Sequence, residues 1–172
     1  MEDMLGIVIP FVGLDRHIGR WRKEHVYNAK DVPAHVTLLI PARNPPLEPD
    51  ELDLLGAIIG SEPPFTVEFT GIDRFGDNVL YLVPEDNGQM RCLHDKLVDM
   101  LGRPAEPYPF VPHLTVAFQP QVDLDVIQRE LEECLRNHFP ISEPVNSLSL
   151  WYGSLNGRWR CAAEFELGHL SR

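Results

Sequence analysis

The chain has 172 residues, of which 44% are hydrophobic, and carries a net charge of −11 with a pI near 5.0. This length suits one globular domain or two closely packed halves. The negative charge excludes binding of long nucleic acids through bulk attraction, although a few local donors can still hold a small anionic ligand.

Cysteine usage and the first residues predict a reduced, cytoplasmic protein without a membrane segment. The three cysteines are far apart and form no Cys-x-x-Cys pair, so we expect neither a disulfide framework nor a zinc site. The start, Met1 to Met4, is acidic where a signal peptide would be basic. The apolar run over 5–12 is too short to cross a bilayer and is expected to be a strand.

The first half of the chain reads as alternating strands and helices. Ile18, Trp21 and His25 recur at helical spacing after Asp15, and the second helix is expected to end at Gly60. The predicted elements, in order, are strand 4–11, helix 15–28, strand 34–41, a proline-rich turn 41–49, helix 50–59 and strand 65–71.

The second half repeats this order. The predicted elements are strand 79–83, helix 89–101, strand 110–118, helix 123–138, strand 145–152 and a closing strand 159–167. Asn156-Gly157 is a strong hairpin signal between the last two strands. The repeat of architecture, over 4–71 and 79–152, predicts two αβ lobes related by a pseudo-twofold axis.

One strand in each half carries the same pair of polar residues. His35 and Thr37 lie in the strand 34–41, and His113 and Thr115 lie in the strand 110–118. Strand side chains alternate between faces, so each histidine and its threonine share one face, roughly 6.6 Å apart. A pseudo-twofold axis would bring these two polar faces together in a shared cleft.

Two facing imidazoles suit general acid–base catalysis. An unperturbed imidazole titrates near pH 6.5, so at neutral pH one ring can accept a proton while the other donates one. Each positioned proton transfer contributes on the order of 10²–10⁴-fold. The two threonine hydroxyls can donate hydrogen bonds to the non-bridging oxygens of a phosphate. The four side chains therefore predict cleavage of a phosphodiester without a metal ion or a cofactor.

These motifs resemble the hallmark of the two-histidine (2H) phosphoesterases, which include 2′-5′ RNA ligases and 2′,3′-cyclic phosphodiesterases. The matching segments are His35-Val36-Thr37-Leu38 and His113-Leu114-Thr115-Val116, the second preceded by Phe110 and Pro112 as is common in the family. The element order is similar over nearly the whole chain. The resemblance implies an α+β fold of two pseudo-symmetric αβ lobes with antiparallel sheets facing a central cleft, in one bilobal domain over residues 1–172.

The resemblance also implies a reaction. It is the metal-independent hydrolysis of a 2′,3′-cyclic phosphate, at an RNA 3′ end or on a small nucleotide, commonly to a 2′-phosphate. His35 and His113 would serve as base and acid, in an order that the sequence leaves open, and Thr37 and Thr115 would bind the phosphate. Two alternatives are reversible 2′-5′ RNA ligation and a non-catalytic member that binds nucleotide, RNA or a protein partner. We expect a monomer.

Three further features are weaker candidates for substrate binding. Arg43 leaves the first motif strand and could line the cleft mouth, although the surrounding prolines also fit a plain loop. Tyr108, just ahead of the second motif, could stack on a base or simply pack. A basic stripe at i, i+4, i+7 on the first helix is better explained as a solvated face than as an RNA contact: Arg16, Arg20 and Lys23.

Overall fold

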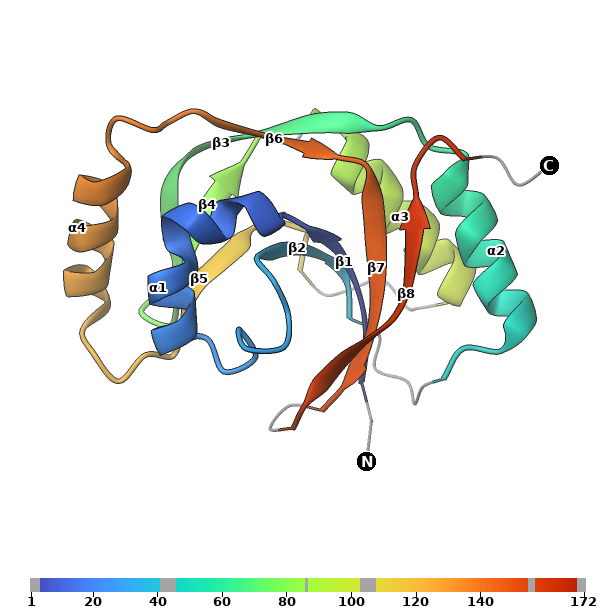
Figure 1. The fold of residues 1–172 in the computed structure, drawn as a ribbon, viewed down its shortest axis with the longest axis horizontal. Coiled ribbons are helices and arrows are strands. Elements are labelled where there is room, and N and C mark those ends of the chain that lie inside the picture. The colour runs from blue at the N-terminus through green and yellow to red at the C-terminus, as the bar shows by residue number, and fades with distance from the viewer. Residues whose placement is uncertain (1–3, 41–45, 86, 103–107, 155–156, 170–172) are drawn as a thin grey trace.

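The computed structural model describes residues 4–40, 46–85, 87–102, 108–154 and 157–169. Eight strands, four α-helices and one 3₁₀ turn make up this part of the chain (Figure 1). In chain order they are β1 (Met4–Pro10), η1 (Val12–Leu14), α1 (Asp15–His25), β2 (His35–Leu39), α2 (Pro49–Gly60), β3 (Phe65–Phe75), β4 (Val79–Pro84), α3 (Gln89–Leu101), β5 (Leu114–Phe118), α4 (Leu124–Leu135), β6 (Ile141–Val145), β7 (Ser147–Gly153) and β8 (Trp159–Glu166).

The strands form two antiparallel four-stranded sheets that match position by position. The first sheet has the order β2-β1-β7-β8, and the second has the order β5-β4-β3-β6. Each sheet therefore has a motif strand at one edge, with the preceding strand of the same half beside it. The third strand of each sheet comes from the other half of the chain: β7 lies beside β1 in the first sheet, and β3 lies beside β4 in the second. The α+β class with two pseudo-symmetric lobes is confirmed, and each sheet draws strands from both halves.

The helices begin and end where the local sequence provides caps. Glu48 and Glu51 form a capping box at the start of α2, with proline in the first turn. Asp123 accepts a hydrogen bond from the Asp125 amide at the start of α4. The left-handed conformation of Gly102 ends α3, as its position in the sequence predicts.

The helices lie in two pairs at opposite ends of the molecule, α1 with α4 and α2 with α3 (Figure 1). The central contacts cross between the halves: α1 packs on β5, and α3 packs on β2. Apolar residues from both sheets and from all four helices form one large core. Within the described part of the chain, no helix combines the length and the apolar character needed to span a bilayer.

Several element boundaries differ from the sequence-based expectations, among them the end of α1, which lies at His25 rather than near residue 28. The second motif strand begins at Leu114 rather than at residue 110, because pairing with β4 starts there and Pro112 offers no N–H. Strand β3 continues to Phe75, four residues past its expected end. Helix α4 ends at Leu135 rather than near 138.

Strand β6 is absent from the predicted elements. Its alternating buried and exposed residues follow a strand pattern, but it is short and contains Pro144. Proline is tolerated at the edge of a sheet, and β6 is the edge strand beside β3. Two predicted features, most of the turn over 41–49 and Asn156 of the hairpin, lie outside the described residues.

Candidate active site

The first His-x-Thr pair lies on β2, at the edge of the first sheet. His35 opens the strand opposite Pro10 of β1, and Thr37 lies opposite Val8. Both motif side chains are half-buried, while Val36 between them is fully buried in the core. The strand thus presents His35 and Thr37 on one side and its apolar residues on the other. We call the side of each sheet that carries its histidine and threonine the motif face.

The second pair occupies the equivalent place in the second sheet. His113 directly precedes β5, and Thr115 lies opposite Tyr81 of β4. Both are half-buried, whereas Leu114 and Val116 are fully buried. The two motif strands, β2 and β5, contact each other across the sheets. The two His-x-Thr pairs are therefore brought to one region of the molecule.

The two imidazoles are anchored in the same way. Nδ1 of His35 lies 2.7 Å from the Pro33 carbonyl oxygen, and Nδ1 of His113 lies 2.9 Å from the Val111 carbonyl oxygen. A carbonyl oxygen only accepts hydrogen bonds, so Nδ1 carries the proton in each ring. In the neutral form Nε2 therefore holds the free lone pair. The hydrogen bond from Nδ1 to the backbone carbonyl two residues earlier therefore sets the same tautomer in both histidines.

Burial depresses the pKa of both histidines. Desolvation is the largest effect at His35 and lowers its pKa to about 4; the hydrogen bond to Pro33 opposes it, while the charges of Arg22 and His113 lower the pKa further. The influence of His113 places the two rings within electrostatic reach of each other. The pKa of His113 is also lowered, mainly by desolvation, against its hydrogen bond to Val111. Without a bound anion both rings favour the neutral form at pH 7.

Aromatic rings form one wall of the site around His113. The Phe75 ring meets the imidazole edge-to-face, with centroids 4.9 Å apart, and the Tyr81 ring lies at 5.4 Å. Phe75 and Tyr81 also contact each other at 4.4 Å. These rings exclude water from one side of His113 and so contribute to the desolvation that lowers its pKa.

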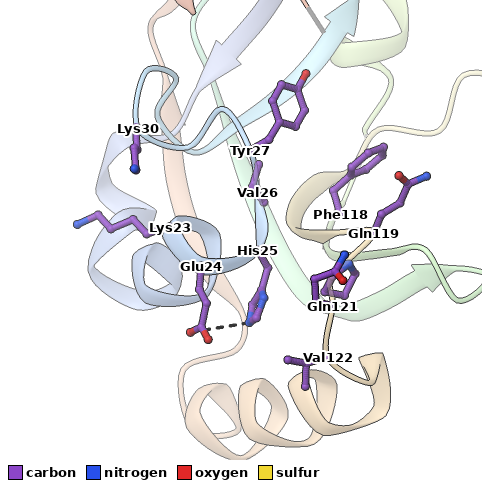
Figure 2. A pocket seen from close by; sticks show the side chains of 11 residues that line it. Lys23, Glu24, His25, Val26, Tyr27, Lys30, Phe118, Gln119, Gln121 and Val122 are labelled. Atoms are coloured by element: carbon purple, nitrogen blue, oxygen red, sulfur yellow. Dashed lines mark ion pairs between the residues drawn. The ribbon is translucent and has the colours of Figure 1, made fainter. Parts of the chain in front are cut away.

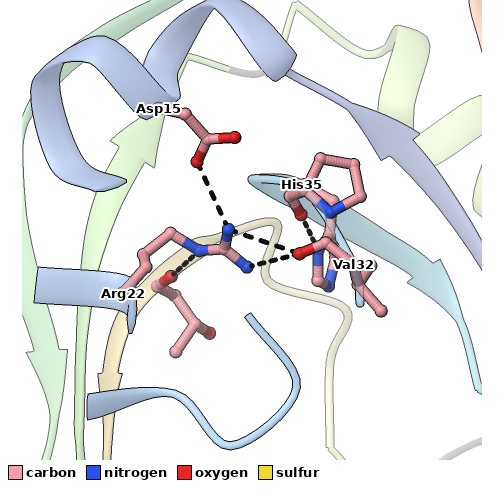
Figure 3. Close-up of polar contacts among 6 residues, drawn as sticks. Asp15, Arg22, Val32 and His35 are labelled. Atoms are coloured by element: carbon pink, nitrogen blue, oxygen red, sulfur yellow. Dashed lines mark hydrogen bonds and ion pairs between the residues drawn. The ribbon is translucent and has the colours of Figure 1, made fainter. Parts of the chain in front are cut away.

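Arg22 of α1 links both motif segments (Figure 3). It is only 2% exposed, and its Nε donates to the Thr115 carbonyl oxygen at 3.3 Å. Its terminal nitrogens donate to the Val32 carbonyl oxygen at 3.4 and 3.5 Å, and one of them pairs with Asp15 at 3.5 Å. The guanidinium therefore ties β5 to the segment that leads into His35. Arg22 is a positioning residue beneath both motifs.

His94 of α3 makes the corresponding link in the other direction. Its Nδ1 donates to the Leu38 carbonyl oxygen of β2 at 2.7 Å. Its ring stacks on Phe110, ahead of the second motif, with centroids 4.1 Å apart and planes within 6°. Arg91 also donates to the Phe110 carbonyl oxygen at 2.9 Å. Helices α1 and α3 thus each brace the motif strand of the opposite half.

The weaker sequence candidates have different outcomes. Arg43 lies outside the described residues. Tyr108 is 80% exposed before β5, and a role in base stacking stays a prediction. Within the described ranges, no group of three or more His, Cys, Asp or Glu side chains is arranged to hold a metal ion.

Sequence reasoning missed four residues that shape the site: Phe75, Tyr81, Arg22 and His94. Arg22 had a detectable signal, because it follows Ile18 by four residues and so falls on the buried face of α1. Phe75 and Tyr81 lie on the paired strands β3 and β4, and their contact with His113 depends on the sheet register.

Two matched antiparallel sheets, each with a His-x-Thr pair at its edge strand, define the two-histidine class of phosphoesterase folds. The chain belongs to the 2′-5′ RNA ligase superfamily, whose family model matches residues 10–157.

Curated relatives and solved structures agree with this family. Proteins described as candidate phosphoesterases from Geobacillus kaustophilus and Bacillus pumilus are each 28% identical, the first over 95% of both chains and the second over 94% of this chain and 95% of its own. E. coli LigT in complex with NADP+ superposes with a TM-score of 0.70 at 18% identity, covering 98% of this chain and 100% of LigT. A Thermus thermophilus protein reaches 0.66 at 18% identity with the same coverage. The structures establish the fold, and the relatives support phosphoesterase activity.

Proposed function

We propose that this chain is a metal-independent phosphodiesterase that hydrolyses 2′,3′-cyclic phosphates at RNA 3′ ends or on nucleotides, leaving a 2′-phosphate. One observation carries the proposal: His35 and His113 hold the same tautomer through the same type of hydrogen bond, two residues back along the chain. Each ring therefore has its Nε2 available for proton transfer. The superfamily and the relatives' descriptions support phosphoesterase activity in general.

The proposed reaction is a single displacement at phosphorus. Nε2 of one histidine takes a proton from water as the water oxygen bonds to phosphorus. The bond from phosphorus to O3′ breaks, and the second histidine, protonated at Nε2, gives its proton to O3′. The products are a 2′-phosphate and a free 3′-hydroxyl, and the two histidines return to their starting states by exchange with solvent. Each proton transfer would contribute on the order of 10²–10⁴-fold.

The pKa values favour His35 as the base. With a pKa of about 4, His35 is neutral at pH 7 and ready to accept a proton. His113 must donate, and the negative charge of a bound phosphodiester favours its protonated form. Thr37 and Thr115, on the two motif faces, would donate hydrogen bonds to the non-bridging oxygens. Such charge-assisted hydrogen bonds are each worth about 1.5–3 kcal/mol.

Hydrolysis of 2′,3′-cyclic AMP in the presence of EDTA tests this proposal. We expect turnover to persist in the chelator and to fall by at least about 100-fold in His35→Ala and in His113→Ala. Thr37→Val and Thr115→Val should each lose roughly 10-fold or more. His138→Ala is the matched control, since His138 is exposed and contacts only the His17 ring among the aromatic contacts of the described residues.

Turnover that survives in either site-histidine variant would overturn the assignment, as would failure to hydrolyse any cyclic phosphate. Fully active threonine variants would remove Thr37 and Thr115 from the phosphate site while leaving the histidine roles intact.

The superfamily's description favours 2′-5′ RNA ligation as a second candidate function. Ligation uses the same two proton transfers in the same direction, with a 5′-hydroxyl in place of water: one histidine takes its proton as O5′ bonds to phosphorus, and the other protonates O3′ as the bond from phosphorus to O3′ breaks. Mixing a 5′-hydroxyl oligonucleotide with an oligonucleotide that ends in a cyclic phosphate separates the two. Formation of a 2′-5′ linkage that depends on both histidines would establish ligation, and hydrolysis alone would exclude it.

A further inference from the structure

A pocket of about 480 Å³ lies between two segments. One is the end of α1 with its following loop, and the other is residues 118–122, which comprise the last residue of β5 and the four residues after it. Figure 2 shows the rings of Tyr27 and Phe118 together at one end of this pocket, with Glu24, His25 and Val122 at the other. The two rings are edge-to-face, with centroids 6.4 Å apart. Both are unusually exposed for aromatic residues, at 52% for Tyr27 and 42% for Phe118.

The sheet register places Phe118 on the motif face of the second sheet. In β4, Val79 and Tyr81 are two residues apart and so point to the same side. Their partners across the strands are Phe118 and Thr115, with a bulge between the two pairs. Directly paired residues share a face, and the extra residue of the bulge brings Phe118 back to the side of Thr115. The aromatic end of the pocket therefore continues the surface that carries His113.

Tyr27 connects this surface to the first sheet. Its hydroxyl lies beside the Trp159 indole, and desolvation is the main effect that raises the pKa of the phenol. Trp159 packs in one cluster with Val8, which is the partner of Thr37 on the motif face of the first sheet. Tyr27 thus stands between the two motif faces, at the edge of the region where the His-x-Thr pairs meet.

The pocket also carries uncompensated positive charge. Lys23 and Lys30 line it, and within the described ranges neither forms an ion pair. The other two members of the basic stripe on α1 are paired, Arg16 with Glu143 and Arg20 with Glu130. The one acidic lining residue, Glu24, faces His25 at 3.9 Å.

We propose that this pocket binds the penultimate nucleotide of an RNA 3′ end, the one before the terminal nucleotide that carries the cyclic phosphate. The preferred substrate is then an RNA end and not a mononucleotide. The inference rests on the proposed hydrolysis of cyclic phosphates. Exposed aromatic rings stack on any base, and ammonium groups attract phosphates. A cyclic mononucleotide has a single phosphate, which the motif residues would hold. Lys23 and Lys30 gain an anionic partner only when a second phosphate joins the terminal nucleotide to the nucleotide before it.

Equilibrium binding to the His35→Ala/His113→Ala double variant tests the pocket without turnover. The ligands are 2′,3′-cyclic AMP and the dinucleotide ApA with a 2′,3′-cyclic phosphate, titrated by calorimetry. We expect the dinucleotide to bind at least 10-fold more tightly. Adding Tyr27→Ala and Phe118→Ala should weaken the dinucleotide by roughly 10- to 100-fold and leave the mononucleotide within about 2-fold. Val126→Ala, an exposed apolar change on α4, is the control.

The lysines give an independent readout. The double variant Lys23→Met/Lys30→Met should flatten the plot of log affinity against log salt concentration by about 0.7 for the dinucleotide alone, because the dinucleotide adds one phosphate. Equal affinity for the two ligands would overturn the proposal. Equal losses for both ligands would also overturn it, because the rings would then hold the terminal base. Failure of wild-type protein to hydrolyse any cyclic phosphate is a separate result that refutes the proposed function, since the binding experiment requires no turnover.

Discussion

Arg22→Met would remove the guanidinium that connects α1 to both motif segments while keeping a side chain of similar length. The carbonyl oxygens of Thr115 and Val32 would lose their donor, and Asp15 would lose its ion pair. Each buried carbonyl left without a donor costs about 1–3 kcal/mol. The partly exposed Asp15 pair contributes at most about 1 kcal/mol.

We therefore expect Arg22→Met to lower the free energy of unfolding by about 2–7 kcal/mol. That is a large share of the 5–15 kcal/mol typical of a domain, so the variant should denature at clearly lower urea. The charge of Arg22 also lowers the pKa of His35. Its removal should raise that pKa, which NMR titration of the imidazole would measure and which loss of stability by itself does not predict.

Arg20→Met on the same helix is the matched control. Its side chain is 70% exposed, pairs with Glu130 at 3.8 Å and lies over the Trp21 ring at 4.2 Å. Loss of these contacts should cost no more than about 1 kcal/mol. If the free energy of unfolding of Arg22→Met lies within about 0.5 kcal/mol of the wild-type value, Arg22 does not brace the motifs. An unchanged pKa of His35 would refute its electrostatic effect.

Two further predictions concern stability. The folded-state pKa of His35, about 4, lies below its unfolded value of 6.5, so the unfolded chain binds more protons between these two pH values. The contribution of neutral His35 to the free energy of unfolding is therefore complete above pH 6.5. It decreases by up to about 3 kcal/mol as the pH falls to 4. Urea denaturation across this range should show a smaller acid loss in His35→Gln, and identical curves would contradict the assignment. Gly153→Ala would place a Cβ 2.4 Å from the Trp159 ring and should cost about 1–3 kcal/mol by the same assay. Gly71→Ala, with nothing within 4 Å of its Cβ, is the control, and equal costs would contradict this account.

Local sequence patterns predicted the main elements because each pattern is short-range. The strand alternation in His35-Val36-Thr37 and His113-Leu114-Thr115 separates polar from apolar side chains without reference to the rest of the chain. Caps such as Asp123 and Gly102 act on neighbouring backbone groups, so they also mark helix ends in the sequence. Strand β6 was not predicted, because a five-residue edge strand that contains a proline has almost no local sequence pattern that indicates a strand.

The sequence by itself determined which side chains do the proposed chemistry, since two His-x-Thr strands in repeated contexts specify both residue types and their shared faces. The tertiary structure decided how those side chains are held and tuned. Arg22 and His94 reach carbonyls on strands distant in the chain, and Phe75 meets His113 through the sheet register. The depressed pKa of His35 likewise comes from desolvation by segments that meet only in the folded protein. Such contacts cannot be predicted from the spacing of residues in a single sequence, because the periodicity of each segment reflects only its own helix or strand and not the segment that it contacts.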